Sequence, residues 1–209
     1  MFKNREEVAK KLTLKILPKI KDGKVLVVAL PRGAVVMGKI IAEFLSLPLD
    51  IVVIKKIGAP FNNELAIGAV AGKNVVFWNK QLISKLKLDE KEMEKLKEEK
   101  QKEREKLEKT LRRDRKEMNS KGKTVILVDD GVATGATVMA ANKYFKKQGA
   151  KKVFLATPVI SIETFKELNK FFDAIIVLRK VSDFYAVGQF YEHFPQVTNR
   201  EVIKILGKN

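Results

Sequence analysis

Short runs made almost entirely of apolar residues recur along the chain and alternate with segments of helical periodicity. Each run has the length of a buried strand and is far too short to cross a membrane. Strands that are apolar on both faces and alternate with helices are typical of a parallel sheet covered on both sides. The sequence therefore predicts an α/β fold, a mostly parallel sheet flanked by helices, with strands at 25–30, 51–54, 75–78, 124–128, 152–156 and 174–178.

The segments between these runs predict helices. Asn4 is a favourable N-cap residue with Glu7 at the capping-box position, and Val8, Leu12 and Ile16 follow at four-residue spacing. Comparable patterns predict a helix that ends near residue 45 and others at about 138–148 and 162–169. A length of 209 residues suits one domain that fills the chain from 1 to 209.

One segment breaks the alternation of strands and helices. From 85 to 118 charged residues dominate, and Glu and Lys recur at spacings that support exposed helix. We expect a helical insertion at about 81–119, formed by one long helix or two joined helices, with a single narrow packed stripe. A coiled coil is the weaker alternative, because Lys100 and Glu103 would occupy consecutive seam positions.

The composition excludes several kinds of site. The chain has no cysteine, which removes disulfides, thiolate nucleophiles and zinc–sulfur centres, and its one histidine, His193, cannot form a histidine-rich metal site. The first seven residues are too charged for a signal peptide, and no apolar run reaches a membrane span, so we expect a cytoplasmic protein. The net charge of +17 fits either a lysine-rich surface or attraction of polyanions such as nucleic acid or phosphorylated metabolites.

The segment 125–137 carries the clearest chemistry. Asp129 and Asp130 follow a predicted strand, at the sheet edge where open α/β folds bind ligands. The loop after them can bring backbone N–H groups close to a phosphate, and a helix N-terminus follows. Two carboxylates beside a phosphate cradle suit the hydroxyls of a phosphorylated sugar, or else a Mg²⁺ pair. The cradle consists of small and hydroxyl-bearing residues, Gly131, Ala133, Thr134, Gly135, Ala136 and Thr137.

This segment resembles the phosphoribosyl diphosphate (PRPP) binding motif of the type I phosphoribosyltransferases. The family pattern is four apolar residues, two acids, two variable positions and a small-residue loop that ends in Thr or Ser. The resemblance implies that Asp129 and Asp130 hold the ribose and act in catalysis, and that 133–137 bind the 5-phosphate. Gly131 departs from the family, which usually has an apolar residue there, and Ala133 stands where some purine-using members carry an acid.

Other parts of the chain extend the resemblance. The segment 30–33 looks like the family's pyrophosphate loop, 55–68 like a mobile loop that closes over the site, and about 180–209 like a C-terminal hood. The resemblance implies a Mg²⁺-dependent enzyme that is a homodimer and transfers the phosphoribosyl group of PRPP to a nitrogenous base. The residues that it assigns are Arg32, Gly33, Lys55 and Lys56 for pyrophosphate, Glu64 for catalysis, Phe184 and Tyr185 for the base, and Glu192 for the metal.

Two rival functions stay open. The segment 33–40 nearly fits the P-loop of an NTPase, but Ile40 stands where a Mg²⁺-binding Ser or Thr is needed. A non-catalytic regulator that senses PRPP and binds nucleic acid through its basic surface is the other, although no helix-turn-helix pattern is evident. His193 and Trp78 are interpreted as structural residues.

Overall fold

A five-stranded parallel sheet forms the centre of the protein. The computed structural model describes residues 1–20 and 23–207, apart from the side chain of Glu64. The strand order is β2-β1-β6-β7-β8, and every neighbouring pair is parallel, as predicted. These strands are β1 (Val25–Ala29), β2 (Leu49–Ile51), β6 (Thr124–Val128), β7 (Lys152–Ser161) and β8 (Ala174–Val181).

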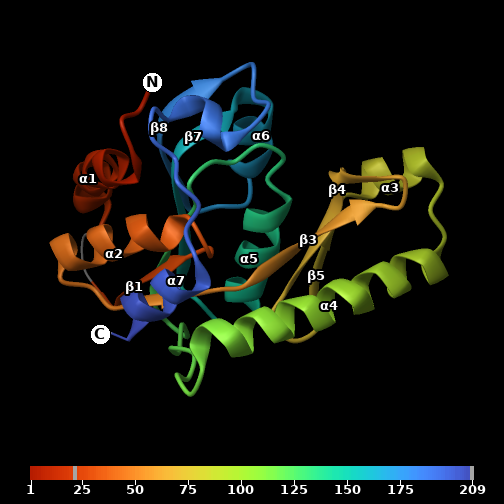
Figure 1. Ribbon diagram of the computed structural model, residues 1–209, viewed down its shortest axis with the longest axis horizontal. Coiled ribbons are helices and arrows are strands. Elements are labelled where there is room, and N and C mark those ends of the chain that lie inside the picture. The colour runs from red at the N-terminus through yellow and green to blue at the C-terminus, as the bar shows by residue number, and fades with distance from the viewer. Residues whose placement is uncertain (21–22, 208–209) are drawn as a thin grey trace.

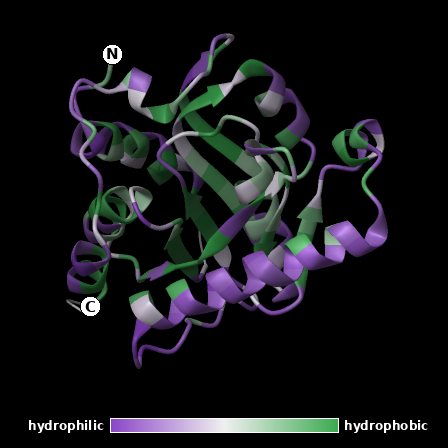
Figure 2. Cartoon of the chain, turned by 45° about the vertical axis from the view of Figure 1, so that its right-hand side comes forward, coloured by the Kyte–Doolittle hydropathy of each residue, from purple (hydrophilic) through white to green (hydrophobic). Residues whose placement is uncertain are grey.

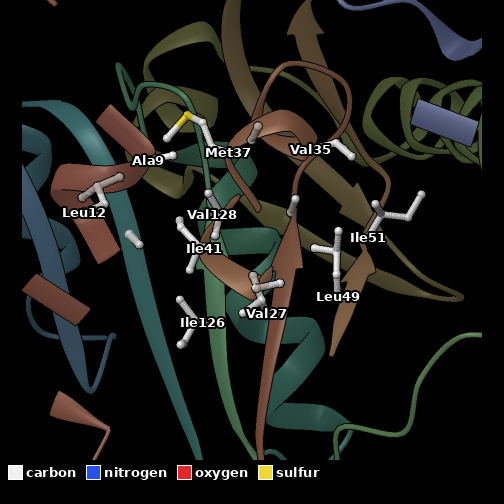
Figure 3. Packing of buried hydrophobic residues seen from close by; sticks show 14 of the residues in the cluster. Ala9, Leu12, Val27, Val35, Met37, Ile41, Leu49, Ile51, Ile126 and Val128 are labelled. Carbon is white, nitrogen blue, oxygen red and sulfur yellow. The ribbon is translucent and has the colours of Figure 1, made fainter. Parts of the chain in front are cut away.

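Helices and a second sheet cover the two faces of this sheet. Alternate residues of a strand point to opposite faces, so Val27 packs into one cluster with helices, while Leu26 and Val28 pack into the other. Figure 3 shows the first cluster, in which side chains of two helices meet those of the central strands. The first face carries α1 (Arg5–Ile16), α2 (Ala34–Leu45) and α7 (Asn199–Leu206), and the second carries α5 (Ala136–Lys147).

The helix starts follow their capping residues. The Asn4 side chain accepts a hydrogen bond from the Glu7 backbone N–H at 3.0 Å, which confirms the predicted start of α1. The Ser161 hydroxyl accepts one from the Thr164 N–H, so α6 (Ile162–Leu168) begins where β7 ends. The described residues also form two short 3₁₀ helices: η1 (Leu17–Lys19) follows α1, and η2 (Val187–Phe190) lies between β8 and α7.

Two of the predicted parallel strands are wrong. The run 51–54 is divided: β2 ends at Ile51 and β3 (Ile54–Ala59) starts a separate sheet. This second sheet is antiparallel and also contains β4 (Asn62–Ala71) and β5 (Val75–Trp78), so 75–78 does not join the parallel sheet. An apolar run indicates burial but not strand direction, and these two strands are partly buried where they pack against helices rather than beside β1.

The charged insertion consists of two helices. They are α3 (Lys80–Leu86) and α4 (Glu90–Arg112), which are separated at Asp89, the N-cap of a complete capping box. In Figure 1, α4 lies along the second sheet, and Figure 2 shows that it is predominantly hydrophilic. The predicted narrow stripe is present, because Leu111 is buried while Leu96 and Leu107 pack against neighbouring clusters. No helix within the described residues is long and apolar enough to cross a bilayer.

A buried ion pair fastens α4 to the central sheet. Arg112 Nη1 lies 2.8 Å from Asp50 Oδ1, and the two side chains are 7% and 2% exposed. The second oxygen of Asp50 accepts the Met118 backbone N–H at 2.7 Å, while Arg112 also donates to the Ile51 carbonyl. Every oxygen of the carboxylate thus has a partner, which a buried charge requires.

Removal of the arginine should expose how much this pair contributes. We expect Arg112→Met to destabilise the protein by about 3–5 kcal/mol, because it leaves the Asp50 carboxylate buried and without its cation. The double variant Asp50→Asn with Arg112→Met should recover part of that loss. Urea unfolding measures both, and Lys106→Met, an exposed position of the same helix, is the control; a loss below about 1 kcal/mol for Arg112→Met would contradict the prediction.

Candidate active site at the carboxyl ends of the strands

Asp129 and Asp130 lie at the carboxyl end of β6, where the sequence places them. The loop after them is tied to β7, which runs to Ser161 and so extends beyond the predicted end at residue 156. Val132 exchanges backbone hydrogen bonds with this extension, donating to the Val159 carbonyl at 2.9 Å and accepting from the Ser161 N–H at 3.1 Å. The loop is therefore supported by the sheet rather than suspended in solvent.

The loop ends in a left-handed glycine that starts α5. Gly135 has φ of +75° and is the N-cap, so Ala136 is the first helical residue. A Cβ atom at Gly135 would lie only 2.9 Å from the Thr164 methyl group, so both the backbone angle and the space favour glycine. Thr134 is exposed and Thr137 half-buried beside it. The free N–H groups of the first turn of α5 and these hydroxyls can together bind an anion.

Arg5 is a site residue that the sequence interpretation missed. Its Nη2 lies 3.1 Å from Asp130 Oδ2 and its Nη1 donates to the Pro195 carbonyl at 2.7 Å, while the guanidinium stacks 3.7 Å from the centre of the Phe194 ring. A cation at the first position of a helix opposes the helix dipole. That unfavourable position in the sequence was the available sign that Arg5 has a tertiary partner.

The C-terminal hood packs directly on the acidic motif. The Tyr191 hydroxyl donates to the Asp130 backbone carbonyl at 2.9 Å, and burial raises the pKa of this phenol, so it stays a donor. A Cβ atom at Gly131 would lie 2.7 Å from a methyl group of Val187. The departure from the family pattern at Gly131 therefore has a steric reason, because a side chain there would push away η2.

The predicted pyrophosphate loop touches the same carboxylate. A Cβ atom at Gly33 would lie 2.0 Å from Asp130 Oδ2 and 2.7 Å from Arg5 Nη2, so only glycine fits beside this pair. The Pro31–Arg32 peptide bond is cis, and the Arg32 side chain is exposed at the same edge of the sheet. The structure thus brings 30–33 and 129–130 together, as the sequence predicts.

Burial sets the protonation of the two acids. Loss of solvent and the neighbouring Asp130 charge together raise the pKa of Asp129 to about 8, against the opposing hydrogen bond from the Asp130 N–H at 2.8 Å. Burial also raises the pKa of Asp130, although Arg5 acts in the opposite direction. The site therefore favours a proton on Asp129, while the Asp130 carboxylate is paired with Arg5.

The segment 55–68, which the resemblance compares with a mobile loop, consists largely of strand. It forms the β3–β4 hairpin, whose tip carries Phe61 with 98% of its surface exposed. Lys55 Nζ lies 3.1 Å from Glu103 Oε2 of α4, and Lys56 faces the opposite side of the strand. Glu64 belongs to β4, but its side chain lies outside the described part of the structure.

The predicted base and metal residues lie in the hood. Phe184 packs edge-on against Phe190 with ring centroids 5.0 Å apart, whereas Tyr185 is 87% exposed. Glu192 is exposed, and the described residues contain no group of three His, Cys, Asp or Glu side chains that could hold a metal. Mg²⁺ keeps waters and substrate phosphates as ligands, so the two adjacent carboxylates of the motif fit an ion that arrives with its substrate.

A pocket of about 370 Å³ adjoins the anion loop. Thr134 and Ala136 form its wall on the motif side, and Phe77, Trp78 and Phe171 supply aromatic surface. Trp78 lines this pocket and also packs against the hydrophobic cluster of the second sheet. His193, in contrast, is an exposed residue of the hood.

The raised pKa of Asp129 predicts that replacing this residue changes the stability of the protein in a pH-dependent way. Its folded pKa exceeds the ordinary value of 3.8, so its ionisation lowers the stability of the free protein as the pH rises toward about 8. Asp129→Asn should therefore stabilise the free protein at pH 8 by at least about 1.4 kcal/mol, one pKa unit, with little gain at pH 4. Urea unfolding at both pH values tests this, with exposed Asp114→Asn as the control; equal effects at both values would refute it.

Several known proteins are similar to this chain in sequence. A model of the phosphoribosyl transferase domain matches residues 2–191. A protein of Mycobacterium tuberculosis provisionally named a phosphoribosyl transferase is 32% identical over the whole chain, and the chain covers 47% of that relative, about half its length. A ribose-phosphate pyrophosphokinase of Prochlorococcus marinus is 35% identical over 42% of the chain and 26% of its own length.

Solved structures agree with the fold. A crystal structure of a Thermus thermophilus protein is 33% identical, covers 100% of this chain and 98% of its own, and superposes with a TM-score of 0.84. A purine phosphoribosyltransferase of Pyrococcus horikoshii is 15% identical with a TM-score of 0.51, over 93% of this chain and 92% of its own, and shows the shared fold. From its motif, its fold and these matches, the chain belongs to the phosphoribosyl transferase domain family.

Proposed function

We propose that the protein transfers the 5-phosphoribosyl group of PRPP to a nitrogenous base and releases pyrophosphate, in a Mg²⁺-dependent reaction. The observation that carries this proposal is the convergence of an acidic pair, a phosphate-binding loop and the 30–33 loop at one edge of the sheet. Membership of the family supports it, and the segment 125–137 resembles the family's donor motif apart from Gly131.

The loop 133–137 would hold the 5-phosphate. Its backbone N–H groups, the Thr134 and Thr137 hydroxyls and the first turn of α5 are donors of the kind that a phosphate needs. The ribose hydroxyls would then donate to Asp129 and Asp130. These hydrogen bonds favour the ionised form of both acids. Binding of PRPP would therefore release the proton that burial keeps on Asp129.

Arg5 acts in this proposal as a positioning residue. It holds one oxygen of Asp130 through Nε and Nη2, at 3.2 and 3.1 Å, and is itself fixed by Pro195 and Phe194. The remaining carboxylate lone pairs stay available to a ribose hydroxyl. Because Arg5 reaches the site from α1, the N-terminal helix would determine the orientation of the catalytic carboxylate.

The diphosphate would lie over the 30–33 loop. Mg²⁺ supplies charge neutralisation for the departing pyrophosphate. Arg32 is exposed beside Gly33 and can contact the same oxygens, and Lys55 and Lys56 are the proposed lysine contacts. As the bond at C1 breaks, positive charge develops on the ribose, and the carboxylates of Asp129 and Asp130 would stabilise it.

The β3–β4 hairpin and the hood would enclose the acceptor. Closure of the hairpin over the donor would exclude water, which competes with the base, and Glu64 on β4 would protonate or orient that base. Phe184 and Tyr185 are the proposed base contacts, and Tyr185 is free to rotate because it is exposed. Homodimer formation, a cytoplasmic location and a metal contact by Glu192 belong to this proposal through the family resemblance.

Direct binding of the donor tests the proposal. Wild type should bind PRPP with Mg²⁺ in calorimetry, and Asp129→Asn with Asp130→Asn should weaken binding roughly tenfold to a hundredfold, the loss of one charge-assisted hydrogen bond or more. Asp114→Asn with Asp183→Asn changes the charge equally at exposed positions and is the matched control. Unchanged affinity in the motif variant would refute the donor assignment.

Pyrophosphate release in a screen of purines, pyrimidines and small amines tests catalysis itself. Release with at least one base, lost in the motif variant, is the expected result. Tight PRPP binding without release for any base, together with salt-sensitive retention on RNA or DNA, would favour the non-catalytic regulator instead.

A further inference from the structure

We propose that the protein has a second anion site, between α4, α5 and the turn that joins β4 to β5, which binds a compact polyanion with at least two phosphate groups. A cavity of about 510 Å³ lies there, in the range of small-molecule sites. Its lining contains six basic side chains and three acidic ones. This inference does not depend on the proposed reaction.

The cavity is separate from the donor loop. Its α5 residues are Tyr144 and Gln148, at the C-terminal end of that helix, whereas the donor loop precedes Ala136 at the other end. Twelve residues of helix separate Ala136 from Gln148, which corresponds to about 18 Å. One ligand of ordinary size therefore cannot fill both places.

Two buried arginines carry unsatisfied donors at this cavity. Arg104 and Arg112 are 1% and 8% exposed, and the Nε atom of each has no hydrogen-bond partner among the described residues. Arg112 Nε lies 3.4 Å from Glu108 Oε1, an ion-pair contact outside hydrogen-bond geometry. Buried guanidinium N–H groups rarely lack acceptors, so the positive charge of these two side chains is incompletely compensated by the residues around the cavity.

Three exposed cations surround the same cavity. Lys73 comes from the β4–β5 turn, and Lys109 and Arg113 from the end of α4. The side chains of these three form no ion pair with any described residue, whereas the other cations of the lining are held by Glu108, Asp50 or backbone carbonyls. The dipole of α4 explains a cation at its last turn, but not one on the β4–β5 turn. Charges gathered from separate elements without counter-ions fit a polyanion.

The ligand chemistry follows from the shape and charge of the site. Arg104 and Arg112 add buried positive charge beside the cavity, and the three exposed cations can donate to phosphate oxygens at its rim. Tyr144 presents little ring surface, because it is 5% exposed and its hydroxyl is bonded to Glu117 at 2.7 Å. The site therefore recognises phosphate groups rather than a stacked base.

Calorimetry with sodium tripolyphosphate, without Mg²⁺ and at 0.15 M salt, tests this site. All titrations use the 209-residue protein with the substitution Thr134→Glu. This substitution places a negative charge in the donor loop and so prevents tripolyphosphate from binding there. In this background tripolyphosphate should bind once per chain. Adding Lys109→Glu and Arg113→Glu should weaken binding at least about tenfold, or 1.4 kcal/mol.

The matched control reverses Lys95 and Lys102, which are exposed on the same helix and do not line the cavity. Lys95→Glu with Lys102→Glu changes the net charge equally, so it should weaken binding less than about threefold. Absence of binding in the Thr134→Glu protein, or equal losses in the two charge-reversal variants, would overturn the proposal. Unfolding curves show that both variants are folded before titration.

Discussion

The parallel pairing of β1 with β6 is the constraint on which the site depends. Their register pairs Ala29 with Val128, the last residues of the two strands, so the chain leaves both strands at the same level of the sheet. The 30–33 loop and the acidic pair are therefore neighbours although about 100 residues separate them in sequence. Gly33 fits against Asp130 only because it lacks a side chain. The proposed binding of PRPP at both of its ends depends on this one pairing.

The environment of the acids shows a conflict between stability and binding. Burial disfavours charge on Asp129 and Asp130, and only Asp130 has a cation within the chain. A site that is poor for two free carboxylates is a good site for a ligand with hydroxyl donors and a developing positive charge. The raised pKa of Asp129 therefore indicates a site that favours ligand binding over the stability of the chain.

Much of the fold could be predicted from the sequence, because burial on both faces of a parallel strand leaves a continuous apolar run. The pattern located β1, β6, β7 and β8 but assigned β5 to the wrong sheet, since β5 is as apolar as a central strand. The acidic motif was recognisable because its residues are contiguous. Arg5 and the Asp50–Arg112 pair were not, because each depends on residues that are far apart in the chain and meet only after folding.

The ion pair between Asp50 and Arg112 has a consequence for how the protein opens. It joins residues 62 positions apart, and so it closes a loop that contains the whole second sheet together with α3 and α4. Asp50 lies on β2 and Arg112 lies at the end of α4. The second sheet with α3 and α4 therefore cannot detach from the central sheet while the pair is intact. Local opening of the hairpin tip near the exposed Phe61 should require less free energy than detachment of this whole unit. Slow hydrogen exchange should therefore extend from the central sheet into the last turns of α4, making core and insertion one cooperative unit.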